Sequence, residues 1–535
     1  MKRRHFFKKT AIGSAVLAAT GMAACTQTNQ SVAEKTFDPS FFELNELTIQ
    51  QLQQKMESGE MTSEAICKTY LERIAAVDPI IHSIIELNPD ALSIAAQMDG
   101  ERKEGKVRGL LHGIPVLIKD NIDTADKMQT TAGSLALEGN IAPEDAFIVA
   151  RLRAAGAVIL GKTNLSEWAN FRSSRSSSGW SGRGGQTRNP FSPDRSPCGS
   201  SSGSGAAISA NLCAIAIGTE TDGSIVCPSG INGIVGIKPT LGLWSRRGII
   251  PIAHSQDTAG PMCRTVTDAA ILLGALAAHD EKDAKPLVEP GKIENNFTQY
   301  LDADGLKGAR IGIARSMSAI RGTEERFEKA IETLKKLGAE IIDPVVFDSD
   351  KKWDEPSFTV LLYEFKADLN RYLATHPLAK PRNMEEIIAF NIANNSKEMP
   401  WFEQELMLAA QATTNLEAEA YKQALADSKR FAQQEGIDKI MKEHQLDAII
   451  APTNGPSWNI DCINGDHYTG GSSSAAAIAG YPSITVPMGF YKGLPLGLSF
   501  FGKAWSEPVL IRLAYAFEQA AQARKVPGFK VIGES

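Results

Sequence analysis

The chain has 535 residues, a net charge of −6, 43% hydrophobic and 22% charged residues, and 45 glycines. This composition is that of a globular protein with a sizeable core and many turns, and it excludes a fibre or a disordered chain. The charge forms no long run of one sign, which excludes the basic surface expected of a nucleic-acid partner.

The N-terminus has the pattern of an export signal, which we assign to residues 1–25. Paired arginines and lysines precede an apolar stretch that is shorter than the roughly 20 residues needed to span a bilayer. Small residues lead to Cys25, and a polar tether follows over residues 26–40. The pattern resembles a twin-arginine signal with a lipobox, in which Cys25 becomes a lipidated N-terminus. Cleavage by an ordinary peptidase, leaving a soluble protein, is the alternative.

We therefore expect an exported protein, periplasmic or held in the cell envelope as a lipoprotein, whose membrane contact is this anchor alone. The twin-arginine route carries proteins that are already folded, so the fold should not depend on disulfides. We predict that most of the other cysteines are small buried hydrophobes. They are Cys67, Cys198, Cys213, Cys227, Cys263 and Cys462.

From residue 41 onward, helical spacing of apolar residues alternates with short buried runs, which predicts an α/β sheet covered by helices on both faces. A stretch rich in serine, arginine and glycine, 171–205, interrupts this pattern, and we interpret it as an ordered loop layer over a catalytic centre. The predicted helices of this half are 41–77, 145–156 and 206–216, and the predicted strands are 112–118 and 158–160.

The second half continues the alternation, and we assign residues 41–530 to a single domain. A long helical stretch at about 355–435 is predicted to be a cap or lid. The charged segment 280–305 is either an excursion or a hinge. The remaining predicted elements are strands 309–314, 339–346, 448–452, 483–487 and 497–502, and helices 323–337 and 506–524.

Several familiar hydrolase patterns do not fit this chain. The eight histidines are scattered and show no H-E-x-x-H spacing, so we expect no metal and no other cofactor. A G-x-S-x-G match at 199–203 lacks the preceding apolar strand that a nucleophile elbow needs. An S-x-x-K match at 349–352 lies in a charged run that we expect to be exposed.

Two residues stand out as candidates for nucleophilic catalysis. Lys119 ends the apolar run 114–118, so its ammonium group should be desolvated, and desolvation lowers a lysine pKa towards the range of a general base. Ser224 follows a small, turn-prone run that begins at Gly218, where backbone N–H groups can converge on a reacting oxygen. Alone, each residue fits an ordinary structural role as well, as a lysine at a strand end and a serine in a turn.

The segments around these two residues, together with several others, resemble the amidase signature family. Within that family they are most similar to the bacterial peptide amidases, which remove the C-terminal amide of peptides. The resemblance runs from about residue 47 to the C-terminal helix. It implies a large mixed, mostly parallel twisted sheet covered by helices. The matching segments are 113–123, 130–134, 161–164, 197–204, 218–228, 236–240, 255–261 and 493–497.

The resemblance also implies roles for individual residues. Ser224 matches the nucleophile, Ser200 the bridging serine that the family holds in a cis conformation, and Lys119 the base. The backbone N–H groups of Thr221, Asp222, Gly223 and Ser224 would form the oxyanion hole. An acyl-enzyme at Ser224 would then be hydrolysed by water.

Three positions depart from the family pattern. Cys198 and Ser202 stand where the family often has glycine, and Asp222 replaces a small neutral residue. Asp222 either bonds a substrate amide N–H or caps the turn. If its side chain faces the pocket, it disfavours anionic groups there.

The expected activity is therefore hydrolysis of a carboxamide, with a small amide or peptide amide as the partner, and the first hypothesis is the C-terminal amide of a peptide. The alternatives are an aryl or fatty acyl amidase of the same mechanism and a catalytically silent peptide-binding lipoprotein. The amidotransferase subunit that works on charged tRNA shares the family's fold, but the export signal argues against that function.

Overall fold

A computed structural model describes residues 42–283, 293–317 and 320–533. The predicted export signal with Cys25 and the tether lie outside these residues, as does part of the charged segment 280–305. The described residues all belong to one compact unit. No helix in the described ranges combines the length and the apolar character needed to cross a bilayer.

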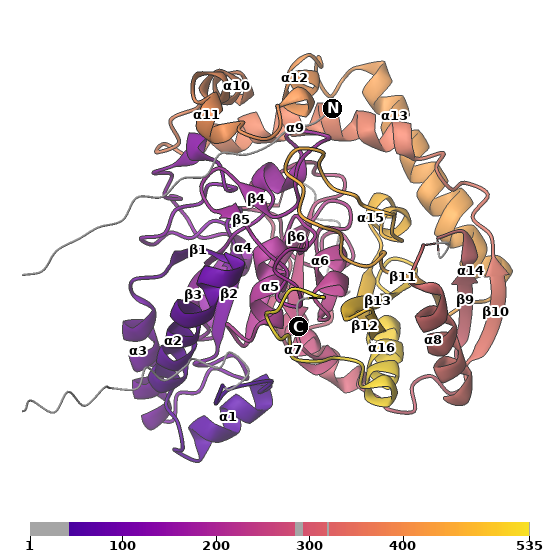
Figure 1. The fold of residues 1–535 in the computed structure, drawn as a ribbon, viewed down its shortest axis with the longest axis horizontal. Coiled ribbons are helices and arrows are strands. Elements are labelled where there is room, and N and C mark those ends of the chain that lie inside the picture. The colour runs from indigo at the N-terminus through magenta and orange to yellow at the C-terminus, as the bar shows by residue number, and fades with distance from the viewer. Residues whose placement is uncertain (1–41, 284–292, 318–319, 534–535) are drawn as a thin grey trace, which may run out of the picture. The chain divides into compact units, whose positions relative to one another are not determined.

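The core of this unit is a sheet of 11 strands. Figure 1 shows its strands surrounded by helices. In sheet order the strands are β1 (Ile84–Leu87), β3 (Val158–Thr163), β2 (Pro115–Lys119), β6 (Ile215–Glu220), β8 (Thr258–Cys263), β7 (Val235–Lys238), β12 (Ser483–Tyr491), β13 (Leu494–Phe501), β11 (Ala448–Pro452), β9 (Arg310–Ala314) and β10 (Glu340–Val345).

The mixed α/β sheet is confirmed, but the expectation that it is mostly parallel was wrong. Only β2 with β3 and β6, and β9 with β10 and β11, pair in parallel. The other pairs are antiparallel, among them the hairpin of β12 and β13. Its turn residues Lys492 and Gly493 both have positive φ, the conformation of a tight hairpin turn.

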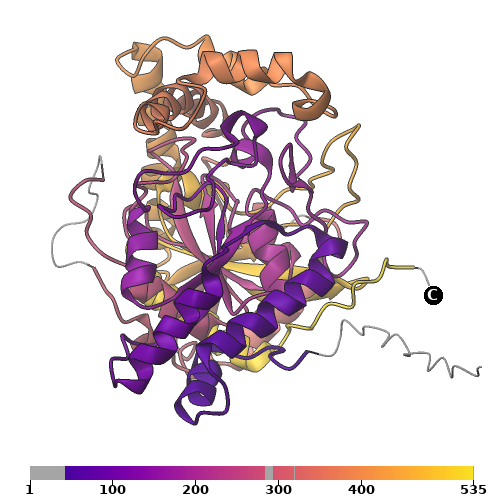
Figure 2. The ribbon, with the colours of Figure 1, turned by 90° about the vertical axis from the view of Figure 1, so that its left-hand side faces the viewer.

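Helices pack around the sheet. Figure 2 shows α2 and α3 side by side across one face, and α2 begins at Ser63 because the Thr62 hydroxyl accepts a hydrogen bond from the N–H of Ala65. These helices are α1 (Ile49–Glu57), α2 (Ser63–Ile81), α3 (Ala91–Lys103), α4 (Phe147–Ala154), α5 (Ser202–Ser209), α6 (Val226–Ile231), α7 (Val266–Leu276), α8 (Glu324–Lys336), α14 (Asp438–Glu443), α15 (Ser474–Ala479) and α16 (Glu507–Ala521).

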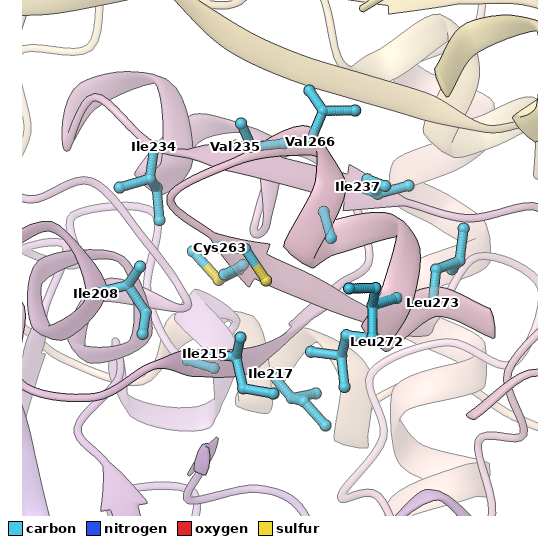
Figure 3. Close-up of a cluster of buried hydrophobic side chains, with 14 of the residues drawn as sticks. Ile208, Ile215, Ile217, Ile234, Val235, Ile237, Cys263, Val266, Leu272 and Leu273 are labelled. Atoms are coloured by element: carbon cyan, nitrogen blue, oxygen red, sulfur yellow. The ribbon is translucent and has the colours of Figure 1, made fainter. Parts of the chain in front are cut away.

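The predicted helix 206–216 is in fact two elements. It holds the second half of α5 and the start of β6, which are separated by Asn211 in a left-handed conformation. Asparagine tolerates this conformation, which ends the helix. Figure 3 shows the core beneath this junction, where Ile208 of α5 and Ile217 of β6 pack near Cys263.

The predicted helical stretch 355–435 contains five α-helices, which we call the cap, and the start of a π-helix over Arg430–Ile437. They lie together at the top of Figure 1, and their apolar residues pack on the loops beneath them, for example Phe365 and Met407 with Leu165 and Ile250. The cap helices are α9 (Asp354–Ala374), α10 (Met384–Ala393), α11 (Asn395–Glu398), α12 (Glu405–Gln411) and α13 (Glu419–Lys429).

Arg172 joins the cap to the serine-rich loop layer. Its side chain is fully buried, donates to the carboxylate of Glu167 and to the carbonyls of Glu398 and Phe402, and lies 4.3 Å from the centre of the Phe402 ring. The layer 171–205 is thus ordered, as expected, and it includes the short strands β4 (Trp180–Ser181) and β5 (Gly185–Gln186).

Removing this arginine should destabilise the protein. Arg172→Met leaves the carboxylates of Glu167 and Glu398 buried without their cation, and breaking a buried pair in this way costs about 3 to 5 kcal/mol. Chemical denaturation checks the loss. The exposed Arg175→Met is the matched control and should change the free energy of unfolding by less than about 0.5 kcal/mol. Equal stability of both variants would contradict the anchoring role.

Candidate active site

Lys119, Ser200 and Ser224 meet at the carboxyl ends of two parallel strands. Lys119 ends β2, and the chain leaves the adjacent β6 at Glu220 to form the turn that carries Ser224. Ser200 lies just before α5. Parallel strands end at the same edge of a sheet, which is where α/β proteins commonly place their sites.

Lys119 is completely buried and makes three polar contacts. Its Nζ lies 2.8 Å from the Oγ of Ser200, 2.8 Å from the Oγ1 of Thr219 and 3.3 Å from the carbonyl oxygen of Thr219. Burial lowers the pKa of Lys119 to about 7, against the opposing effect of Asp257 and Glu220.

These contacts suit the neutral amine. A neutral amine has two hydrogens, which the two oxygens of Thr219 can accept, and one lone pair, which then faces Ser200. The Nδ2 of Asn121 also donates to the Thr219 hydroxyl, at 3.0 Å. In its neutral state, which burial favours, Lys119 can accept the proton of the Ser200 hydroxyl across the 2.8 Å contact.

Ser200 is fully buried, and the peptide bond between Gly199 and Ser200 is cis. The backbone packs closely here: a Cβ on Gly199 would lie 2.1 Å from the Oγ of Ser166. The carbonyl of Ser200 accepts a hydrogen bond from the N–H of Ser166 at 3.1 Å. Glycine at position 199 thus allows the close approach that holds the Ser200 hydroxyl against Lys119.

Ser224 lies beside this pair in the turn that precedes α6. The N–H of Ser201 donates to the Ser224 carbonyl at 3.2 Å, which joins the two serine segments. The Ser224 side chain is only 8% exposed, and its hydroxyl bonds no other side chain among the described residues. The buried carboxylate of Glu220 fixes the turn by accepting from the N–H groups of Ile225 and Val226 at 2.8 and 3.0 Å.

The turn also presents unused backbone donors. Within the described residues, the N–H groups of Asp222, Gly223 and Ser224 donate to no protein acceptor. Gly223 has a φ of 78°, a conformation that glycine adopts without strain. Free N–H groups beside a serine hydroxyl are the arrangement that stabilises an oxyanion.

A cavity of about 570 Å³, which we call the cleft, opens beside Gly199 and Gly223. Asp222 lines it and accepts a hydrogen bond from the Ser473 hydroxyl at 2.6 Å. The Asp222 side chain therefore both holds the turn and faces the pocket. Residues from the cap and from the loop between β11 and α15 complete the lining, among them Phe358, Leu406, Trp458, Asp466 and Tyr468.

The cysteine prediction was partly wrong. Cys67, Cys213 and Cys263 are buried free thiols, as expected. Cys198 and Cys227, however, form a disulfide, which joins the segment before Ser200 to the helix after Ser224. A separation of 29 residues gives no sequence signal for this pairing, because only the fold brings the two turns together.

Comparison with known proteins now identifies the family. The model of the family described as Amidase matches residues 65–511. The chain belongs to the amidase signature family. Its members hydrolyse carbon–nitrogen amide bonds, and this chain is an amidase.

Relatives of this amidase extend over nearly its whole length. A probable amidase of Arabidopsis thaliana is 42% identical over 92% of this chain and 93% of its own. The solved structure of the peptide amidase from Stenotrophomonas maltophilia is 53% identical and has a TM-score of 0.88, covering 91% of this chain and all of its own. A glutamyl-tRNA(Gln) amidotransferase subunit from Caldanaerobacter subterraneus is 36% identical over 89% of this chain and 97% of its own.

Sequence patterns alone missed several residues around the site. Thr219 and Glu220 lie inside the matched segment 218–228, and Gln256 and Asp257 lie inside 255–261, yet nothing in those patterns gave them a role. Their positions in matched segments were the available signal. Their partners are distant in sequence, so only the tertiary structure shows what they contact.

The pKa of Lys119 predicts the pH dependence of the amidase. If the neutral amine is the base, kcat/KM should increase about tenfold per pH unit up to the pKa of about 7, because protonation removes the base below that pH. Above it, kcat/KM should be constant. Lys119→Met should lower kcat/KM by roughly a hundredfold to ten-thousandfold at pH 8. Initial rates between pH 5 and 9 measure both effects. An unchanged rate for this variant would remove Lys119 as the base.

Proposed function

We propose that this amidase hydrolyses the C-terminal carboxamide of peptides through an acyl-enzyme at Ser224 and releases ammonia. The observation that carries the proposal is the buried amine of Lys119, which is hydrogen-bonded to Ser200 beside the turn of Ser224. A neutral base, a relay serine and a free hydroxyl next to unused N–H donors are the parts that acyl transfer requires.

In the first half-reaction, Ser224 attacks the amide carbon and its proton passes to Ser200, while the proton of Ser200 passes to Lys119. The negative charge on the carbonyl oxygen faces the free N–H groups of residues 222–224. Return of a proton from Lys119 through Ser200 to the leaving nitrogen allows the carbon–nitrogen bond to break. Ammonia departs and the acyl group remains as an ester on Ser224.

Water completes the reaction by the same relay. Water gives one proton to Ser200, whose own proton passes to Lys119, and attacks the ester carbon. The relay then returns a proton to the Ser224 oxygen as the ester bond breaks, which releases the peptide acid and restores the Ser224 hydroxyl. Asp222 lines the cleft beside this centre. A carboxylate there repels the anionic peptide acid but not the neutral amide. This difference favours an amide as the substrate and helps the product acid to leave the cleft.

The lining of the cleft supports a peptide. Phe358, Trp458 and Tyr468 offer aromatic surface for an apolar side chain, and the half-exposed Phe358 and Tyr468 extend that surface to solvent. The likeness to the Stenotrophomonas peptide amidase points to the same substrate class. Phe358 and Leu406, both from the cap, also support the second candidate, an aryl or fatty acyl amide.

A substrate panel tests the proposal. Protein lacking residues 1–25 is incubated with amidated peptides, aryl anilides and fatty amides, and release of ammonia or amine is measured. Amidated peptides should give the highest kcat/KM, and Ser224→Ala should lower it by at least about a thousandfold. Turnover of anilides or fatty amides alone would favour the second candidate. Binding of peptides without any turnover would indicate the catalytically silent peptide-binding lipoprotein.

We also propose that the protein is exported by the twin-arginine route and anchored through Cys25. The signal in residues 1–25 motivates this proposal. The Cys198–Cys227 disulfide supports it, because disulfides persist in oxidising compartments outside the cytosol. Such a bond can close after transport of the folded chain.

Expression in a bacterium with this transport route tests export. The full chain should fractionate with the envelope, carry a lipid label and contain the oxidised Cys198–Cys227 pair, as measured by alkylation and mass spectrometry. Replacing both Arg3 and Arg4 with lysine should leave it in the cytosol with reduced thiols. An exported, unlabelled wild type would instead indicate ordinary peptidase cleavage, and a cytosolic wild type would contradict export.

A further inference from the structure

The segment 254–257 lies between the cap and the turn that precedes Ser224. Its side chains contact Thr221 on one side, and its backbone and side chains contact cap helix α9 on the other. None of these contacts belongs to the relay of Lys119, Ser200 and Ser224. They raise the question of what the segment does for the reaction.

On the side of the active site, the segment holds Thr221 by its carbonyl group and its hydroxyl group. The Nε2 of Gln256 donates to the Thr221 carbonyl at 3.3 Å, and the Thr221 hydroxyl donates to the Oδ1 of Asp257 at 2.6 Å. The other oxygen of Asp257 accepts from the N–H groups of Ile252 and Ala253 at 2.8 and 2.9 Å. Asp257 is therefore itself fixed, and it restrains the start of the turn.

The bond from Gln256 acts on an oxyanion donor. The carbonyl of Thr221 and the N–H of Asp222 belong to one peptide unit, which is planar and has these groups pointing in opposite directions. A donor that holds the carbonyl therefore sets the direction of the Asp222 N–H. Gln256 is only 2% exposed, so its side chain is restrained by the surrounding structure as well.

On the side of the cap, three residues of α9 hold the segment. The hydroxyl of Ser357 donates to the Oε1 of Gln256 at 3.0 Å. Glu364 accepts from the N–H of Ser255 at 2.9 Å, and Asp368 accepts from the N–H of His254 at 3.1 Å. The side-chain amide of Gln256 thus connects α9 directly to Thr221, in the turn that precedes Ser224.

We propose that Gln256 is a positioning residue that couples cap helix α9 to the oxyanion hole. It aims the N–H of Asp222 at the reacting carbonyl oxygen while α9, through Ser357, holds the amide of Gln256 in place. The inference rests on the proposed acyl transfer to Ser224. In this role the cap lines the cleft and also keeps the N–H groups of the oxyanion hole oriented towards the substrate oxygen.

The main test is Gln256→Met, which keeps the length of the side chain and removes both hydrogen bonds. We expect kcat to fall about a hundredfold, the loss typical of one oxyanion donor, with KM changed less than about threefold. Inhibition by a peptide aldehyde, which forms an oxyanion on addition of Ser224, should weaken by a similar factor. Binding of the corresponding peptide alcohol, which forms none, should not change.

A double-mutant cycle tests the coupling to the cap. Ser357→Ala should lower kcat about tenfold in the wild type and have no further effect in Gln256→Met, because the bridge is already broken. Ser357→Thr, which retains the hydroxyl, should restore most of the rate. Glu355→Ala, an exposed change on the same helix, is the matched control and should leave kcat unchanged. Thermal unfolding of each variant verifies that it is folded.

The outcomes separate this inference from the proposed function. If aldehyde or substrate labels Ser224 in the wild type but Gln256→Met retains its kcat, the positioning role is overturned and the proposed function stands. If the effects of Gln256→Met and Ser357→Ala multiply, the coupling to the cap is overturned. If Ser224 is never labelled in the wild type, the proposed function fails, and the inference fails with it.

Discussion

The burial of the Lys119 amine is the constraint on which the site depends. An ammonium group that forms no ion pair is expensive in a protein interior, so burial favours the neutral amine against the opposing charges of Asp257 and Glu220. Two oxygens of Thr219 orient that amine, and its remaining contact is the Ser200 hydroxyl. Lys119 can occupy this position because β2 and β6 are parallel neighbours that end at one edge of the sheet.

Close backbone packing, hydrogen bonds and a disulfide hold the surrounding loops in position beside Lys119. A Cβ on Gly199 or Gly203 would collide with its neighbours, so glycine there lets the segment of Ser200 reach Lys119. Glu220 and the Cys198–Cys227 disulfide tie the serine turns to each other and to α6. Preorganised donors of this kind need little rearrangement when charge develops on a substrate oxygen.

The cap connects to this centre through polar contacts as well as apolar packing. Arg172 fastens it to the loop layer, and the segment 254–257 connects α9 with Thr221. An element that lines a cleft and also restrains the catalytic turn can affect turnover without touching the reacting atoms. Small displacements within this network can change the rate of the reaction, because oxyanion donors act only at short range.

The family, the amidase chemistry and the local pattern of most helices and strands follow from the amino-acid sequence, because apolar periodicity and glycine-rich turns are properties of neighbouring residues. The matched segments also led to Lys119, Ser200 and Ser224 as candidates. Properties that depend on residues far apart in the sequence became known from the folded structure. Strand direction was one such property: β8, with Gly260 and Pro261 in its middle, is recognisable as a strand through its pairing with β6 and β7. The disulfide and the bridge from Ser357 through Gln256 to Thr221 were others, because each joins residues that only folding brings together.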